Sequence, residues 1–241
     1  MERTLRLVAF DLDGTLTQHK SPLGDANRHV LEQLSKNHQL LMVGAGGCLR
    51  IFQQMNRFPI NIIGNYGMQY AEWDATVQDL IIRQDTHVDV DRQEILRRAE
   101  CLRNLFDLHD FAGETMEFHA SGMLTFPILG TQAKIEDKLA YDPDRARRKE
   151  MLPKVQELFH DYTVFIGGSS SFDIVPHPFC KLHALRQYMQ EHDLHEENVL
   201  YCGDDYGPGG NDHDIYASGI PFVTIDDYRS LPDRLAERGL I

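Results

Sequence analysis

The stretch that most constrains the fold is LRLVAFDLDGT, which runs from Leu5 to Thr15. It joins an apolar run to two carboxylates, Asp11 and Asp13, and to a glycine, Gly14. An apolar run bounded in this way by Asp and Gly is typical of a central strand in a parallel sheet. Open α/β sheets carry their chemistry just beyond the carboxyl ends of their strands. The stretch therefore predicts that Asp11 and Asp13 lie where a reacting group would be held.

Two other interpretations of this stretch are weaker. An Asp-Gly pair is the commonest signal for a short β-hairpin, and an EF-hand loop needs a third acidic position and a glycine spacing that are absent here. A second acidic stretch, Gly203-Asp204-Asp205, lies near the other end of the chain. Two acidic strand ends favour one shared site over a hairpin.

The charge of the chain limits its partners. Its 241 residues carry a formal net charge of −13, which argues against nucleic acid or an anionic membrane as a partner. An anionic substrate would need local help from a metal, a few cations or helix N-termini. We expect a cytoplasmic protein, because no apolar run approaches the ~20 residues that span a bilayer, no signal peptide is evident, and four widely spaced cysteines fit free thiols.

Both ends of the chain alternate between helical and strand patterns. Together with the strand that ends at Phe10, this alternation predicts right-handed crossovers and a parallel sheet. The predicted elements are helices over residues 25–36, 48–55 and 182–192 and strands over 40–43, 60–63, 199–202 and 221–225.

The middle of the chain follows another pattern, with the order helix, strand, strand, helix, strand, strand. This order predicts a separate α+β unit of four antiparallel strands and two helices. We place an α/β core over residues 1–83 and 180–241, and the inserted α+β unit over 84–179. The predicted elements of the insertion are helices over 89–105 and 142–160 and strands over 114–119, 123–128, 162–166 and 171–175.

The acidic strand ends point to metal-assisted phosphoryl chemistry. Carboxylates such as Asp11 and Asp204 repel one another unless a hard cation lies between them, and Mg²⁺ suits such a cluster. One carboxylate can attack phosphorus, and a second, two residues on, can protonate the leaving oxygen. Lys181 is a candidate to neutralise the phosphoryl charge, although a lone lysine at such a place is more often a solvated surface charge.

A set of short motifs carries a resemblance to a known family. They are Asp11-Leu12-Asp13-Gly14-Thr15, Gly64-Asn65-Tyr66-Gly67, Met116-Glu117-Phe118, Gly122-Met123-Leu124, Gly167-Gly168, Ser171-Phe172-Asp173-Ile174-Val175-Pro176, Lys181, Gly203-Asp204-Asp205 and Pro208-Gly209-Gly210-Asn211-Asp212. These motifs resemble those of the haloacid dehalogenase (HAD) superfamily of phosphotransferases and, within it, the eukaryotic-type phosphomannomutases. The resemblance implies a HAD-like, Rossmann-type parallel-sheet core with an inserted α+β cap domain of a type IIB-like form.

The resemblance also implies a role for each matching residue. Asp11 would be the nucleophile, and Asp13 would be the general acid/base. Lys181 would orient Asp11 and the phosphoryl group, and Asp173 would contact sugar hydroxyls. The Mg²⁺ ligands would be Asp11, the backbone carbonyl of Asp13, Asp204 and Asp212.

This chain departs from the family pattern where phosphate would be held. The mutases use cap arginines for the distal phosphate of a sugar bisphosphate, whereas the matching positions here are His119, Thr131 and Lys138. Loss of bidentate arginine contacts weakens phosphate recognition in geometry and in charge. Arg145 or Arg147 is an alternative source of positive charge in the insertion.

A second departure lies after the second strand. The superfamily usually places a phosphate-binding Ser or Thr where this chain has Gly46. Backbone N–H groups at the following helix N-terminus would contribute instead, together with Arg50.

We therefore predict Mg²⁺-dependent hydrolysis of a small phosphorylated metabolite, a sugar phosphate, through an aspartyl-phosphate on Asp11. The first alternative is a phosphomannomutase. The second is a non-catalytic protein that binds a phosphorylated metabolite, as the Gly46 departure would allow. The sequence does not determine the oligomeric state, and a homodimer formed through the cap stays open. The predicted substrate contacts are Gly46, Arg50, His119, Lys138 and Asp173.

Other signals have simpler interpretations. The run Gly44-Ala45-Gly46-Gly47 is similar to a dinucleotide fingerprint, but Leu49 occupies the third glycine position. The histidines show no zinc-type spacing, and we interpret His213 as a solvated or capping residue. We interpret Phe172 and Tyr201 as core packing.

Overall fold

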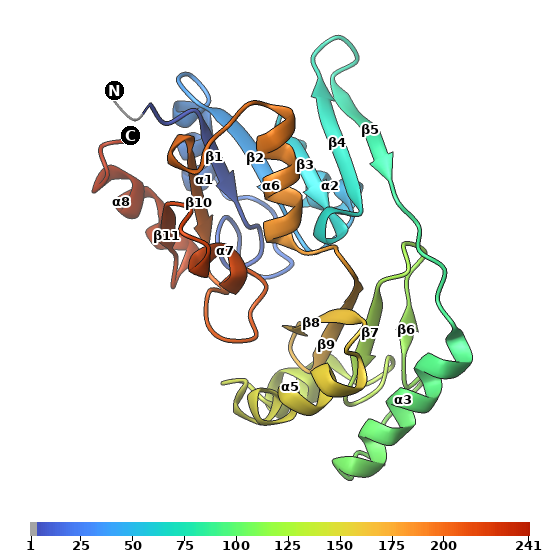
Figure 1. Cartoon of the computed structure of the whole chain (residues 1–241). Helices are drawn as coiled ribbons and strands as arrows, with labels where there is room; N and C mark the ends of the chain where they lie inside the picture. Colours follow the sequence, from blue (N-terminus) through green and yellow to red (C-terminus); the bar gives the residue numbers. More distant parts are fainter. Residues whose placement is uncertain (1–3) are drawn as a thin grey trace. The chain divides into compact units, whose positions relative to one another are not determined.

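The computed structural model describes residues 4–241, which divide into two compact units (Figure 1). The core unit comprises the described residues up to Asp85 together with Lys181–Gly207 and Asp212–Ile241. The cap unit comprises Thr86–Cys180 and Pro208–Asn211. Residues 208–211, which the sequence analysis places in the core, group with the cap unit, where the Gly209 carbonyl accepts a 2.9 Å hydrogen bond from the Ile166 N–H.

Within the described residues, the core unit has one sheet of seven strands in the order β11-β10-β1-β2-β3-β4-β5. Its first five strands in this order are parallel, as predicted. The strands β4 and β5 add an antiparallel hairpin that the sequence patterns do not predict. The strand bounds are β1 (Leu7–Phe10), β2 (Gln39–Val43), β3 (Asn61–Gly64), β4 (Gln69–Asp74), β5 (Asp79–Asp85), β10 (Val199–Gly203) and β11 (Phe222–Thr224).

Alternate residues of β1 face two different helical layers. Val8 and Phe10 belong to an apolar cluster with α1, α2 and α8, whereas Leu7 and Ala9 belong to a cluster with α6 and α7. A strand that is buried on both faces must be apolar throughout, which explains the unbroken apolar run before Asp11. The helices are α1 (Asp25–Leu34), α2 (Cys48–Gln54), α6 (Lys181–Glu191), α7 (His213–Ala217) and α8 (Leu231–Ala236), with short 3₁₀ helices η1 (Asn65–Gly67), η2 (Glu196–Asn198) and η3 (Tyr228–Ser230).

The cap unit has a four-stranded antiparallel sheet in the order β6-β7-β9-β8. One face of this sheet carries the apolar residues that pack against α3 and α5, among them Phe126 and Ile174. The opposite face carries the partly exposed Thr125 and Asp173, which pair across β7 and β9. The bounds are α3 (Arg92–Leu105), β6 (Glu117–Phe118), β7 (Leu124–Pro127), α4 (Ile135–Tyr141), α5 (Ala146–Leu158), β8 (Tyr162–Gly167) and β9 (Ser171–Pro176).

The polar helix predicted over 142–160 is wrong at its start, because α5 begins at Ala146, and the sequence patterns did not predict the preceding helix α4. Arg145 adopts a left-handed backbone conformation, with φ of 61°, directly before α5. The buried Asp142 accepts hydrogen bonds from the N–H groups of Arg147 and Arg148 at 3.0 and 3.1 Å. These bonds satisfy donors in the first turn of α5 that have no partner within the helix.

Across residues 4–241 we find no helix with the length and hydrophobicity that a bilayer crossing requires.

Arg148 ties α5 to the turn between β8 and β9. Its side chain is 1% exposed, and its Nε donates to Oδ2 of Asp142 at 2.8 Å. Its Nη1 donates to the carbonyls of Gly167 and Gly168 at 2.8 and 3.0 Å. A buried charge is tolerated only when it is paired and hydrogen-bonded in this way.

Replacing Arg148 by Met should therefore lower the free energy of unfolding by about 3–5 kcal/mol, because it leaves the buried Asp142 carboxylate without its counter-charge. Urea unfolding followed by circular dichroism measures this loss. Arg186→Met is the matched control, since Arg186 forms an exposed ion pair with Glu196 and should cost less than about 1 kcal/mol. Equal losses in the two variants would contradict the structural role of Arg148.

Candidate active site

The parallel register of β1 and β10 brings Asp11 and Asp204 to one edge of the core sheet. Phe10 pairs with Cys202, and the Asp11 N–H continues the ladder by donating to the Cys202 carbonyl at 2.9 Å. Asp11 follows Ala9 by two residues, so its side chain continues on the face of β1 that α6 and α7 cover. This face carries the remaining charged groups of the site.

A buried lysine joins Asp11 to Asp212. The side chain of Lys181, the first residue of α6, is fully buried, and its Nζ donates to Oδ1 of Asp11 at 2.6 Å. The same Nζ donates to Oδ1 of Asp212 at 2.8 Å. Asp212 immediately precedes α7 and is also fully buried. Three segments that are far apart in the sequence thus meet at one ammonium group.

The cluster carries more negative than positive charge. Oxygen atoms of Asp11, Asp204 and Asp212 lie within 4.8 Å of one another. Burial raises the pKa of Asp11 well above its ordinary value, and the neighbouring Asp212 and Asp204 add to this increase against the opposing effect of Lys181. Burial alone would lower the pKa of Lys181, but the two carboxylates that it contacts outweigh burial and raise it. Three carboxylates and one ammonium leave the site with surplus negative charge, which a divalent cation would balance.

The donor set fits Mg²⁺. All three groups are carboxylates, and hard divalent cations prefer oxygen ligands. Asp204 also lines a cavity of about 370 Å³ between the loop after β1 and the residues around η3. The hydroxyl of Thr15 donates to Oδ1 of Asp204 at 3.0 Å and holds this carboxylate at the edge of the cavity.

The position directly after Asp13 requires a glycine, Gly14. Its φ is +99°, a conformation that side chains disfavour. A Cβ at this position would lie 2.2 Å from Oδ2 of Asp204. The glycine in the Asp-Gly pair therefore makes space for the second acidic strand end, which the hairpin interpretation does not require.

The carboxylate of Asp13 points to a different set of partners. Its Oδ1 accepts hydrogen bonds from the Lys20 N–H at 2.8 Å and from Nε2 of Gln54 at 2.6 Å. Its Oδ2 lies 3.7 Å from Nη2 of Arg50. Among the described residues, the carboxylates grouped as a candidate metal site do not include that of Asp13. A metal contact through its backbone carbonyl remains a prediction.

Gly46 and Arg50, both predicted to bind substrate, lie together. A Cβ at Gly46 would lie 2.2 Å from Nη2 of Arg50, so the guanidinium occupies the space that a serine or threonine side chain would fill. Nη1 of Arg50 donates to Oε1 of Gln54 at 2.8 Å. The guanidinium thus lies beside Gly46, where the family resemblance predicts a phosphate-binding hydroxyl, and beside Asp13.

The predicted residues of the cap unit form two groups. Nε2 of His119 lies 3.0 Å from the hydroxyl of Thr125, which pairs with Asp173 on the polar face of the sheet. Lys138 lies on α4 instead, where its Nζ donates to the Thr131 carbonyl at 3.2 Å. Lys138 and Thr131, two of the departures from the family pattern, are therefore in direct contact.

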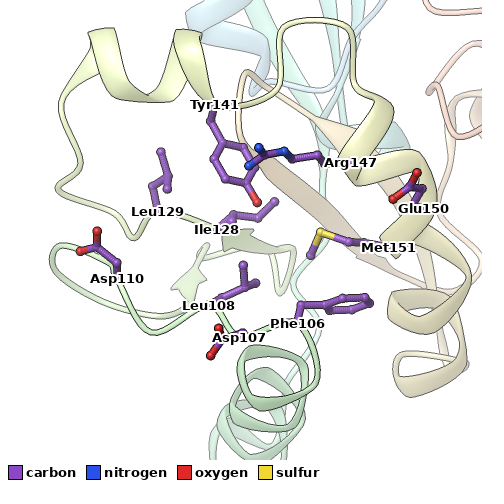
Figure 2. Close-up of a pocket in the computed structure, with 10 residues that line it drawn as sticks. All are labelled: Phe106, Asp107, Leu108, Asp110, Ile128, Leu129, Tyr141, Arg147, Glu150 and Met151. Carbon is purple, nitrogen blue, oxygen red and sulfur yellow. The ribbon is translucent and has the colours of Figure 1, made fainter.

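Arg147 lines a separate cavity of about 450 Å³ in the cap unit (Figure 2). Its guanidinium lies over the ring of Tyr141, 5.3 Å from the centroid, above apolar side chains that include Ile128 and Met151. The described residues that line this cavity do not include His119, Lys138 or Asp173. Arg147 thus lies with a different group of side chains from the predicted substrate contacts.

Sequence reasoning missed three side chains that hold the site. Thr15 and Gln54 bind Asp204 and Asp13, respectively, as described above. Tyr201 was interpreted from the sequence as core packing. Its hydroxyl also donates a hydrogen bond to Oδ1 of Asp212 at 2.7 Å. The available signal for Tyr201 was a phenol in a fully buried strand, because a buried hydroxyl needs a partner.

Replacing Lys181 by Met should destabilise the fold near neutral pH by about 3–5 kcal/mol, because it leaves buried carboxylates without their counter-charge. Burial raises the pKa of Asp11 in the folded protein. A carboxyl group of this kind contributes to stability at a pH below its pKa in the unfolded chain, about 3.9, and this contribution is lost as the pH rises. The variant should therefore approach wild-type stability in acid. Urea unfolding in EDTA at several pH values measures both effects.

Lys154→Met is the control for this series, since Lys154 forms an exposed pair with Glu157. A loss of stability in Lys181→Met that is the same at acidic and neutral pH would contradict the electrostatic explanation.

Comparison with known proteins assigns the family. The family model for eukaryotic phosphomannomutase matches residues 27–226. A phosphomannomutase of Dendrobium officinale is 27% identical over 248 residues, covering 96% of this chain and 92% of that protein. A phosphomannomutase of Drosophila melanogaster is 28% identical over 231 residues, covering 90% of this chain and 88% of the other.

Solved structures show the same fold. An IMP-nucleotidase of Plasmodium falciparum has a TM-score of 0.70 at 14% identity, covering all of this chain and 69% of that one. A HAD subclass IIB sugar phosphatase has a TM-score of 0.62 at 14% identity, covering 98% and 100% of the two chains. These structures show a likeness of fold, and the family match over most of the chain shows that the chain belongs to the eukaryotic phosphomannomutase family.

Proposed function

We propose that this protein transfers phosphoryl groups of hexose phosphates through Asp11 with Mg²⁺, and that phosphomannomutase-type interconversion is its activity. The observation that carries the proposal is the buried network in which Lys181 joins Asp11 to Asp212. The proposed nucleophile Asp11 is one of the three carboxylates that would hold Mg²⁺, and Asp204 and Asp212 lie beside it. The named relatives, which are phosphomannomutases, support interconversion over hydrolysis.

The residues of the core unit have distinct roles in this proposal. A carboxylate oxygen of Asp11 attacks phosphorus, the bond from phosphorus to the sugar oxygen breaks, and Asp13 gives that oxygen a proton. Lys181 holds the Asp11 carboxylate in one orientation and offsets negative charge on the phosphoryl group. A Mg²⁺ ion held by Asp11, Asp204 and Asp212 would supply a Lewis acid for the phosphoryl oxygens.

The second half of the reaction returns Asp11 to its free state. A sugar hydroxyl gives its proton to Asp13 and its oxygen attacks the aspartyl-phosphate, which restores both carboxyl groups. Water in place of the sugar hydroxyl gives hydrolysis by the same steps. The two activities therefore differ in which acceptor reaches phosphorus, and the residues that bind the sugar phosphate decide this.

Hydrolysis is a second candidate, because of particular contacts in the cap unit. His119 and Lys138 stand at positions where the mutases carry arginines. His119 is hydrogen-bonded to the Thr125 hydroxyl, and Lys138 is hydrogen-bonded to the Thr131 carbonyl. Neither side chain offers the planar, two-donor geometry with which arginine holds phosphate. A weaker hold on the distal phosphate would favour water as the acceptor.

One assay separates these functions. The protein is incubated with Mg²⁺, mannose 1-phosphate and a catalytic amount of a hexose bisphosphate, and mannose 6-phosphate and free phosphate are measured in the same tube. We expect mannose 6-phosphate in excess of free phosphate. The reverse ratio would support hydrolysis, and neither product, with ligand-induced thermal stabilisation, would support the binding-protein alternative.

The control for this assay is Asp11→Asn, which should abolish both products because an amide cannot form the aspartyl-phosphate. Asp74→Asn, at the end of β4, where the carboxylate accepts a hydrogen bond from the Thr76 N–H of the following turn, should leave both products unchanged. Activity that survives Asp11→Asn would contradict the proposed nucleophile.

Replacing Arg50 by Met should raise KM for the sugar phosphate by about tenfold or more, because hydrogen bonds to charged groups contribute about 1.5–3 kcal/mol. The guanidinium occupies the hydroxyl position beside Gly46, so its loss leaves the phosphate with backbone donors. Steady-state kinetics measures the change. Arg57→Met, which removes an exposed ion pair with Asp79, is the control, and equal KM values in the two variants would count against a phosphate contact by Arg50.

A further inference from the structure

The hydroxyl of Tyr201 is an unusual group for its position in β10. The residue is fully buried, and its ring packs in the apolar layer with α6 and α7, 5.4 Å from the ring centroid of Phe222. Phenylalanine would supply the same packing. The hydroxyl adds one interaction to this packing, the 2.7 Å hydrogen bond that it donates to Oδ1 of Asp212.

This bond changes which oxygen of Asp212 remains open. Oδ1 accepts from both Lys181 and Tyr201, at 2.8 and 2.7 Å, and two donors use the acceptor capacity of one carboxylate oxygen. Oδ2 accepts one bond, from the Asp205 N–H at 3.2 Å. The remaining capacity of the carboxylate to bind a cation therefore lies at Oδ2.

The backbone around Gly203 confirms that these groups are tightly packed. A Cβ at Gly203 would lie 2.6 Å from Oδ2 of Asp212 and 2.9 Å from Cε1 of Tyr201. Both side chains thus press against the residue that directly precedes Asp204. The position of Asp212 is thus fixed by its contact with Gly203 and by the hydrogen bonds that Tyr201 and Lys181 donate to its Oδ1.

We propose that Tyr201 is a positioning residue whose hydroxyl holds Asp212 with Oδ2 open toward the divalent cation shared with Asp11 and Asp204. Without the hydroxyl, Oδ1 keeps only Lys181, and the carboxylate gains rotational freedom that cation binding must remove. Partners of this kind behind a metal ligand commonly tune metal affinity. The inference rests on the proposed function, because the cation belongs to that proposal.

The test is a calorimetric titration of Mg²⁺ into the whole protein without substrate. In Tyr201→Phe the dissociation constant for Mg²⁺ should rise by about tenfold, the lower end of the range for such partners. Tyr70→Phe is the matched control, because the Tyr70 hydroxyl donates to Glu72 at 3.3 Å on β4, away from the carboxylate cluster. Its Mg²⁺ affinity should equal that of the wild type.

Kinetics separates positioning from a general loss of structure. In Tyr201→Phe the Mg²⁺ concentration for half-maximal turnover should rise in parallel with the dissociation constant, while the rate at saturating Mg²⁺ should change less. A merely structural effect would lower the rate at every Mg²⁺ concentration. Circular dichroism in EDTA establishes that the variant is folded.

A double-mutant cycle tests whether Tyr201 acts through Asp212. Adding Tyr201→Phe to Asp212→Ala should cause no further loss of Mg²⁺ affinity, because the alanine has no oxygen for Tyr201 to hold. Additive losses, or a wild-type Mg²⁺ affinity in Tyr201→Phe alone, would overturn the inference while leaving the proposed function intact. A wild-type protein that binds no Mg²⁺ would overturn both. Mg²⁺ binding without phosphoryl transfer would overturn the proposed function alone.

Discussion

The site depends on one buried ammonium group. Lys181 lies at the start of α6 and contacts Asp11 after β1 and Asp212 before α7. Buried carboxylates at such short separations would otherwise repel one another. Lys181 reduces this repulsion without cancelling it. The surplus negative charge leaves the arrangement ready for a divalent cation, so one interaction serves both the fold and the proposed chemistry.

The two-sided burial of the core sheet places these groups on one face. Because side chains alternate along a strand, Ala9 and Asp11 share the face that α6 and α7 cover, and Tyr201 lies on the same face of β10. The apolar residues of this face form the layer beneath the helices, and the polar residues lie where the strands end. A shift of one residue in the register of β1 would turn Asp11 to the α1 and α2 face, away from Lys181.

The cap unit contains the predicted antiparallel sheet, but the side chains at the positions predicted to hold phosphate are not arginines. Its antiparallel sheet presents His119, Thr125 and Asp173 on one polar face, and Lys138 is engaged by a backbone carbonyl on α4. In the core unit, the Arg50 guanidinium fills the space beside Gly46. Family membership therefore supports the general chemistry, whereas the choice of acceptor depends on side chains that are particular to this chain.

The sequence by itself determined the parallel core, the inserted α+β unit and the acidic strand ends, because these follow from apolar periodicity and from short local motifs. Asp11 and Lys181 were candidates from the residues themselves, and the family resemblance gave them and Asp212 their predicted roles. Only the tertiary structure decided that the Tyr201 hydroxyl reaches Asp212, that Gln54 and Arg50 hold Asp13, and that a further helix, α4, precedes α5. These features depend on contacts between distant residues, which no local pattern records. Periodicity tells whether a tyrosine is buried, but only the packed fold shows what its hydroxyl meets.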